Sequence, residues 1–281
     1  MAEQKERKKW TGKGIGVAVL DTGIFPHMDF DGRIAVFKDF ISGRRSCYDD
    51  NGHGTHVAGI LAGSGAASGG KYCGMAPGAH LAVLKVLDQR GNGQKQDVVR
   101  ALRWVLENRE IYGIRVVNIS VGTTEKNRNH SALIRAVEEV WDAGLVVVTA
   151  AGNMGPAPGS ITAPGCSRKV ITVGSSDLLS GQDSISGIGP TRECVVKPDL
   201  VTWGSGITSC SASGRDKYAV KSGTSMSTPR IAGAAACMLE KDPRLTNREI
   251  KMLLRESARD LGYGKNQQGW GAFDREKFLS L

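Results

Sequence analysis

The stretch GVAVLDTG, residues 16–23, has the pattern of a buried strand that ends in a turn. Its aliphatic and β-branched residues run without interruption to Asp21, after which Thr22 and Gly23 allow the chain to turn. Similar runs predict further strands: HLAVLKVL (80–87), VVNISVG (116–122), LVVVTAAG (145–152) and KVITVGSS (169–176). Continuous apolar runs of this kind indicate strands that are covered on both faces.

Helical patterns separate these strands. An apolar period of helical spacing runs through residues 94–112, and SALIRAVEEVWDAG (131–144) ends in a glycine typical of a helix C-terminus. VAGILAGSG (57–65) and SMSTPRIAGAAACML (225–239) indicate buried helices, and TNREIKMLLRESARDLG (246–262) an amphipathic helix capped by threonine. The alternation predicts a three-layer α/β fold, with a mostly parallel central sheet and helices on both faces.

Composition indicates a globular protein and disfavours two classes of partner. The 281 residues are 40% hydrophobic and 23% charged, and no run is long and apolar enough to span a bilayer. The 37 Lys and Arg against 28 Asp and Glu give a net charge of +9, but the basic residues are scattered. We therefore expect a solvated basic surface, with no nucleic-acid or membrane partner. No boundary divides the chain, and nothing in it specifies an oligomeric state.

The N-terminus and the cysteines bear on the cellular compartment. MAEQKERKKW is basic but is followed by no apolar stretch before Gly14, so it lacks the pattern of a secretory signal. We expect a cytoplasmic protein, or an exported one if the chain is a mature fragment. The six cysteines show no zinc-like spacing, and reduced thiols are favoured over three disulfides: Cys47, Cys73, Cys166, Cys194, Cys210 and Cys237.

Two motifs fail as ligand sites. GKGIG (12–16) precedes a strand, whereas a dinucleotide-binding glycine motif follows one. His53 and His56 in NGHGTHVAGI (51–60) are three residues apart and lack the glutamate of a zinc-binding helix. A metal pair is therefore disfavoured, and a catalytic base becomes the alternative to explore.

A catalytic histidine needs a nucleophile and an acid that orients it, and the sequence offers a candidate for each. Asp21 ends the first strand, and Ser225 in SGTSMSTP stands at the entrance of a helix, two residues after Gly223. Serine needs a base to remove its proton, and the base must be oriented by a third group. Asp21, His53 and Ser225 supply these roles in the chain order known for subtilisin.

With these three residues in this order, the chain resembles the subtilisin-like serine peptidases, the subtilases, from about residue 12 to about residue 278. AVLDTGI, HGTHVAG and GTSMSTP surround the three residues in order, and AAGN ends at Asn153. The resemblance, closest to bacterial intracellular-type members without a prodomain, implies the subtilisin-like fold. It also implies a basic N-terminal extension over 1–11 and a catalytic domain over 12–281.

The resemblance implies a serine endopeptidase with the following site. His53 matches the catalytic base, and Asn153 matches the side chain that binds the oxyanion together with the Ser225 backbone N–H. His56 matches a second histidine that serves structure. An extended peptide substrate would lie between two segments, Gly91, Asn92 and Gly93 on one side and Ser120, Val121 and Gly122 on the other. The primary pocket would be lined by Val121, Ala150, Met154 and Thr162.

Departures from the family pattern set expectations for specificity and for metal. Met154 stands where an acidic residue is common, which favours an apolar, medium to large residue before the scissile bond. AASGGKYCGMAP (66–77) lacks the acids and amides of a tight calcium loop, although Asp29 matches that site's carboxylate. No cofactor is expected to be required, and calcium would be a weak structural ion bound at Asp199. Ser227 and Arg230 replace a usual alanine and histidine.

Two other functions remain as alternatives. An esterase of the α/β-hydrolase kind would use a serine too, but GTSMS lacks the closing glycine of its motif and the order of the three residues differs. A non-catalytic peptide-binding protein could keep the same fold, but we would expect such a protein to lose one of the three residues.

Overall fold

The computed structural model describes residues 10–123, 132–181 and 184–281. Its centre is a seven-stranded parallel sheet in the order β2-β3-β1-β4-β5-β6-β7. The strands are β1 (Gly16–Asp21), β2 (Ile34–Asp39), β3 (His80–Lys85), β4 (Ile114–Ile119), β5 (Val146–Ala150), β6 (Ile171–Ser175) and β7 (Leu200–Thr202). Every residue of β1 and β5 is buried, as the continuous apolar runs predict.

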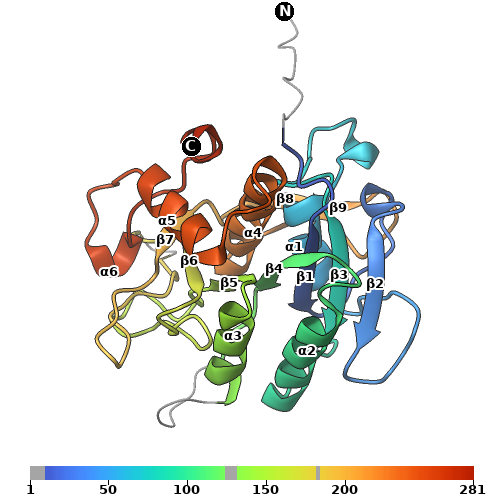
Figure 1. Ribbon diagram of the computed structural model, residues 1–281, viewed down its shortest axis with the longest axis horizontal. Helices are drawn as coiled ribbons and strands as arrows, with labels where there is room; N and C mark the ends of the chain where they lie inside the picture. Colours follow the sequence, from blue (N-terminus) through green and yellow to red (C-terminus); the bar gives the residue numbers. More distant parts are fainter. Residues whose placement is uncertain (1–9, 124–131, 182–183) are drawn as a thin grey trace, which may run out of the picture.

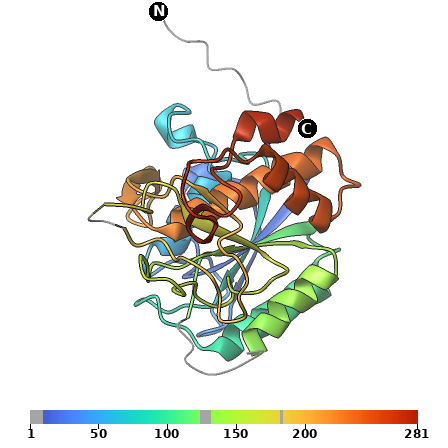
Figure 2. The ribbon, with the colours of Figure 1, turned by 90° about the vertical axis from the view of Figure 1, so that its left-hand side faces the viewer.

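Helices cover both faces of this sheet, so the predicted three-layer α/β architecture is confirmed. α2 (Lys95–Asn108) and α3 (Ala132–Asp142) lie on one face, and α1 (His53–Ala62) and α4 (Thr224–Lys241) lie on the other (Figure 1). The view turned by 90° shows α5 (Asn247–Ser257) on the same side as α4 (Figure 2). Two short helices complete the C-terminal part, α6 (Lys265–Gln268) and α7 (Arg275–Ser280).

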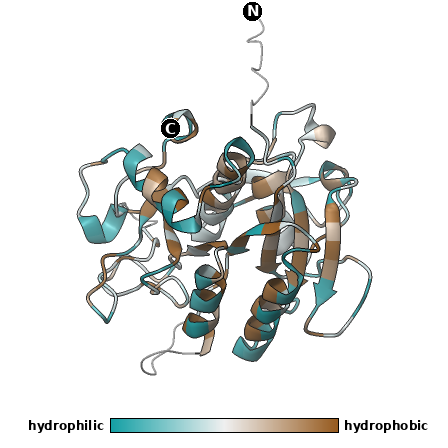
Figure 3. Cartoon of the chain, in the orientation of Figure 1, coloured by the Kyte–Doolittle hydropathy of each residue, from teal (hydrophilic) through white to brown (hydrophobic). Residues whose placement is uncertain are grey.

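The helices of the two layers differ in how they are buried. α2 and α3 turn an apolar stripe to the sheet and a polar face outward, as the hydropathy colours show (Figure 3). α4 is instead buried along most of its length and packs closely on α1. A Cβ at Gly233 would lie 3.1 Å from the Leu61 carbonyl oxygen of α1, so the lack of a side chain at Gly233 allows this close packing.

The strand order determines where the functional residues meet. β1 lies between β3 and β4, so Asp21 at its end is flanked by the segments that follow those two strands. The carboxyl ends of parallel strands share one edge of the sheet, and ligands bind at that edge in open α/β folds. Asn153, which follows β5, reaches the same edge because β5 neighbours β4.

Some elements differ from the sequence predictions. β2 was not predicted, because its edge position leaves polar and apolar residues mixed. The antiparallel hairpin of β8 (Ile207–Cys210) and β9 (Tyr218–Lys221) was not predicted either, because its strands are short and polar. α2 ends at Asn108 rather than at residue 112. α5 ends at Ser257 rather than at residue 262, because Arg259 then pairs with Ala272 as a β-bridge.

The helix cap predicted at Thr246 and the reduced cysteines can also be compared with the structure. Thr246 accepts from the Glu249 N–H and Glu249 closes the reciprocal bond, so the predicted threonine cap of α5 is confirmed. All six cysteines are free thiols. Among the described helices, none is long and apolar enough to cross a membrane. The expected N-terminal extension lies, up to residue 9, outside the described residues.

Candidate active site

Asp21 and His53 form a hydrogen-bonded pair at the carboxyl edge of the sheet. The carboxylate of Asp21 is fully buried, and its Oδ1 lies 2.7 Å from His53 Nδ1 and accepts from the Thr22 N–H at 2.7 Å. A carboxylate can only accept, so Nδ1 carries the imidazole proton and Nε2 is left with a free lone pair. The pair therefore fixes His53 in the tautomer that a general base needs.

The loop before α1 presents His53 at the first position of the helix. The carboxylate of Asp49 holds this loop in place. It accepts hydrogen bonds from the Thr22 hydroxyl (2.8 Å) and the Gly52 N–H (2.8 Å). It also accepts from the N–H (2.8 Å) and the hydroxyl (2.6 Å) of Thr55. Burial raises the pKa of Asp49, but these hydrogen bonds outweigh burial and lower it. Asp49 was not among the predicted site residues, although an acid shortly before a helix start is a capping signal.

The two histidines of the HGTH motif differ in environment. Burial lowers the pKa of His53, but the charge of Asp21 and its hydrogen bond outweigh burial, so the pKa is raised above its ordinary value of 6.5. His56 is fully buried, and its Nε2 lies 3.0 Å from the Ile207 carbonyl and 3.1 Å from that of Ala219. Burial lowers the pKa of His56 to about 4, so it is a neutral side chain that ties α1 to the β8–β9 hairpin.

Ser225 is the second residue of α4, where the backbone N–H groups have no partner within the helix. Gly223 precedes the helix at a φ of 137°, and a Cβ there would lie 3.0 Å from Asn153 Nδ2. The Ser225 hydroxyl donates to the Ser120 carbonyl at 2.7 Å. A hydroxyl has one proton, so in this structure it is directed to Ser120 and not to His53.

The amide of Asn153 is held in one orientation. Its Oδ1 accepts from both the N–H and the hydroxyl of Thr224, each at 3.0 Å. The Thr224 hydroxyl in turn accepts from the Gly152 N–H at 3.2 Å. With Oδ1 so engaged, the NH₂ group of Asn153 lies next to Gly223, beside the start of α4. The NH₂ group of Asn153 therefore lies close to the start of α4, two residues before Ser225.

The structure brings the predicted substrate segments to the edges of this site. Residues 91–93 form an exposed turn after β3, in which Gly91 has a φ of 77° and Asp88 accepts from Arg90 and Asn92. Ser120 and Val121 follow β4 directly, and Gly122 is exposed. The two segments follow β3 and β4, the strands that flank β1.

The predicted pocket residues lie on three adjoining segments. Thr123 and Ala163 exchange two backbone hydrogen bonds (3.0 and 3.1 Å), and the Thr162 N–H donates to Ala151 at 3.0 Å. A Cβ at Gly122 would lie 2.3 Å from Thr162 Oγ1, so Thr162 fills the space beside that glycine. Ala150 is buried, whereas Met154 is 58% exposed.

The region that matches the family's tight calcium site, around Asp29, does not fit a cation. Asp29 accepts from the N–H groups of Gly65 and Ala67 and from the Tyr218 hydroxyl (3.1, 3.0 and 2.9 Å). His27 and Cys210 lie close enough to form a metal-like group with it. However, both His27 nitrogens are hydrogen-bonded, and burial raises the pKa of the Cys210 thiol, so it stays protonated. Donors, and not a cation, satisfy this carboxylate.

The weak cation site at Asp199 stays a prediction, and in this structure two lysines contact its carboxylate. Lys197 Nζ lies 2.6 Å from Asp199 Oδ2 and also donates to the Val170 carbonyl at 3.0 Å. Lys251 Nζ lies 3.3 Å from Asp199 Oδ1 and donates to Val170 at 2.9 Å. Burial lowers the pKa of Lys197 to about 8, so it is still protonated at neutral pH. Two ammonium groups fill the place that the carboxylate and the carbonyls would offer to an ion.

Chelation is therefore expected to leave both the initial rate and the unfolding temperature unchanged. The physical reason is that hydrogen-bond donors and lysines complete the two carboxylate sites. The measurement is peptide hydrolysis and thermal unfolding after chelator treatment and dialysis. Activity lost and restored by zinc would contradict a serine mechanism, and stability restored by calcium would show that a cation site exists after all.

The fold and this arrangement are those of an α/β serine hydrolase. The chain belongs to the subtilase family, whose model matches residues 12–271. It is 43% identical over 270 residues to serine protease AprX of Bacillus subtilis (strain 168), covering 87% of this chain and 61% of AprX. It is 36% identical over 266 residues to subtilisin Savinase of Lederbergia lenta, covering 95% of this chain and 91% of Savinase.

Solved structures agree with this assignment. Sphericase superposes with a TM-score of 0.82 at 30% identity, over 94% of this chain and 92% of that one. A cold-adapted subtilisin-like serine proteinase superposes with a TM-score of 0.78 at 30% identity, over 97% and 91%. The family match and the relatives named as a serine protease and as a subtilisin confirm the predicted enzyme class, a hydrolase that acts through serine.

Proposed function

We propose that this chain is a serine endopeptidase in which Asp21, His53 and Ser225 form the catalytic triad. The observation that carries the proposal is the 2.7 Å contact of Asp21 Oδ1 with His53 Nδ1, at the sheet edge that also receives the start of α4. The proposed substrate is a peptide or protein bound in extended form. The preferred residue before the scissile bond is apolar.

The proposed reaction begins with a proton transfer. His53 Nε2 takes the proton of Ser225 as Oγ attacks the scissile carbonyl carbon, and the carbonyl oxygen becomes an oxyanion. His53 then gives that proton to the departing amine as the C–N bond breaks, which leaves an acyl group on Ser225. Water, activated by His53, hydrolyses the ester. Asp21 keeps the imidazole oriented and stabilises its charged form.

Substrate binding could also redirect the nucleophile. The Ser225 hydroxyl donates to the Ser120 carbonyl, which belongs to one of the two segments proposed to pair with the substrate backbone. A substrate N–H that binds this carbonyl would compete for it. The hydroxyl would then turn, by rotation about Cα–Cβ, toward His53. The productive hydrogen bond would thus form when a peptide is bound.

The proposed oxyanion hole consists of Asn153 Nδ2 and the Ser225 N–H. Asn153→Ala is expected to lower kcat by about 10²–10³ with little change in KM, a magnitude known for the corresponding residue of subtilisin. Thr224→Val should cause a smaller loss, because it removes one of two donors that orient Asn153. Thr224→Ser keeps that hydroxyl and is the matched control. Wild-type kcat in Asn153→Ala would remove this residue from the mechanism.

The experiment that tests the whole proposal is cleavage of a denatured proteome, with the new termini identified by mass spectrometry. We expect internal cuts that follow apolar residues, because Val121, Ala150 and Thr162 offer no charged group and the exposed Met154 is apolar. Hydrolysis of simple esters without any cleavage of proteins would favour an esterase. Binding of peptides without turnover would favour a non-catalytic function.

A further inference from the structure

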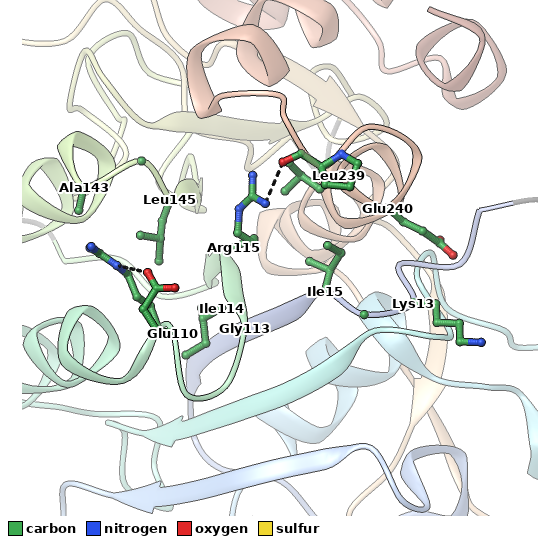
Figure 4. A pocket seen from close by; sticks show the side chains of 14 residues that line it. Lys13, Ile15, Glu110, Gly113, Ile114, Arg115, Ala143, Leu145, Leu239 and Glu240 are labelled. Atoms are coloured by element: carbon green, nitrogen blue, oxygen red, sulfur yellow. Dashed lines mark hydrogen bonds and ion pairs between the residues drawn. The ribbon is translucent and has the colours of Figure 1, made fainter.

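Two cavities lie away from the proposed active site, and they differ in how their charged groups are paired. The larger, of about 520 Å³, is shown in Figure 4. There, Arg115 donates to the Pro243 carbonyl, Arg109 pairs with Glu110, and Glu240 accepts from the N–H groups of residues 11 and 12. The arginines and Glu240 of this cavity therefore have partners from within the fold.

The smaller cavity, of about 300 Å³, lies where α1, β8, α4 and α7 meet the loop over residues 71–75. Its charged side chains are all basic: Lys71, Arg230 and Arg275. Among the lining residues, all of which belong to the described part of the chain, there is no aspartate or glutamate. Three formal positive charges thus line one half-open cavity without a compensating charge on its walls.

The two arginines are partly buried, and each has one buried donor atom without a partner. The Nε atoms of Arg230 and Arg275 are both buried, and neither has a hydrogen-bond partner within the described residues. A buried donor without a partner costs about 1–3 kcal/mol, more for a charged group. Two such groups lining one cavity are therefore expected to have a ligand that satisfies both.

Among the described residues, the neighbours of Arg230 supply no acceptor for its Nε atom. Its guanidinium lies 6.0 Å from the centre of the Trp203 ring, a cation–π contact that supplies no acceptor for Nε. Burial lowers the pKa of Arg230, and the charge of Asp177 offsets this only in part. The carboxylate of Asp177 is itself engaged by the Ser175 hydroxyl and by the N–H groups of Gly204 and Ser205.

We propose that this cavity is a binding site for a phosphate-class oxyanion, held between Arg230 and Arg275 with Lys71 at its mouth. Planar guanidinium groups bind phosphate and carboxylate oxygens through paired N–H donors. Two arginines and a lysine match the charge of a phosphate dianion better than that of a single carboxylate. A volume of about 300 Å³ is at the low end for ligand sites, so it suits free phosphate or a small phosphomonoester.

The position of the cavity gives the bound anion a structural consequence. Arg230 lies on α4, the helix that begins with Thr224 and the proposed nucleophile, and Arg275 begins α7 at the C-terminus. An anion that contacts both arginines would connect the C-terminal segment to the nucleophile-bearing helix. Phosphate is therefore expected to stabilise the folded chain in proportion to its concentration relative to Kd.

The test is calorimetric titration with inorganic phosphate, at ionic strength held constant with sodium chloride. The Ser225→Ala chain is used so that self-cleavage does not contribute. We expect saturable binding that Arg275→Gln and Arg230→Gln each weaken by about tenfold or more, the equivalent of one charge-assisted hydrogen bond. Arg255→Gln, an exposed arginine on α5, is the matched control and should bind like the parent.

The outcomes separate the proposal from non-specific charge effects. Binding that is absent, or that is the same in Arg275→Gln as in Arg255→Gln, would overturn the site. Acetate that binds as tightly as phosphate would overturn the assignment to phosphate. Glycerol 3-phosphate binding more tightly than inorganic phosphate would identify a phosphomonoester as the ligand, and weaker binding would identify the free anion. Should Arg230→Gln fail to fold, Arg275→Gln decides the question.

Discussion

Replacement of Ser225 by alanine is expected to abolish peptide hydrolysis while the protein stays folded. The change removes the attacking oxygen and leaves the rest of the site in place. In subtilisin, a member of the same family, loss of the serine lowers kcat by about 2 × 10⁶, and we expect a loss of this order here. The residual rate would come from the oxyanion donors and from substrate binding alone.

The chain offers a matched control for this experiment two residues further along the same helix. Ser227 is buried, and its hydroxyl donates to the Thr202 carbonyl at 3.0 Å, away from the proposed reaction. Ser227→Ala should therefore keep kcat within a few-fold of the original chain. Both variants are compared by casein hydrolysis and by thermal unfolding. Undiminished hydrolysis by a folded Ser225→Ala protein would rule out Ser225 as the nucleophile.

Replacement of Asp21 by asparagine is expected to lower kcat by about 10⁴, as is known for the equivalent change in a serine protease of another fold. The carboxylate accepts the proton of His53 Nδ1, whereas an amide can present its NH₂ group there and favour the wrong tautomer. Asp31→Asn is the matched control, since Asp31 is an exposed carboxylate paired with Arg215 at the surface. Equal activity in the two variants would contradict the role of Asp21.

The same variant should change the pH profile in a defined direction. Only neutral His53 can accept the serine proton, so the rate rises with pH through the pKa of His53. Because the charge and hydrogen bond of Asp21 outweigh burial and raise that pKa, the acid limb of kcat/KM should lie above pH 6.5. Asp21→Asn removes the two largest effects that raise the pKa of His53 and leaves burial, which lowers it. The limb should therefore move to lower pH, and a shift to higher pH would contradict this account.

The sequence predicted the parallel sheet and the meeting of the candidate residues for physical reasons. The continuous apolar runs 16–23 and 145–152 have the pattern of doubly covered strands, and strand ends in such sheets share one edge. Asp21 ends the first strand and Asn153 closely follows β5, so their meeting could be expected. The edge strand β2 and the β8–β9 hairpin lack this pattern, because one side of each is exposed to solvent.

The contacts within the site depended on the three-dimensional structure. The hydrogen bond of Ser225 to Ser120 joins residues 105 positions apart, and the five hydrogen bonds that organise Asp49 leave only a weak capping signal in the sequence. At Asp199 the sequence suggested a ligand, whereas the structure shows a contact within the protein. Its carboxylate suggested a cation, but the sequence did not reveal that Lys251, from a distant helix, would lie 3.3 Å away.

The most direct test of the proposed triad is the labelling of the protein by a fluorophosphonate, with the modified residue identified by mass spectrometry. Such a probe reacts with a serine that a neighbouring base activates. The account predicts a single adduct on Ser225 in the original chain, with labelling lost in His53→Ala and retained in Ser227→Ala. An adduct on another residue, or equal labelling of Ser225 when His53 is absent, would contradict it.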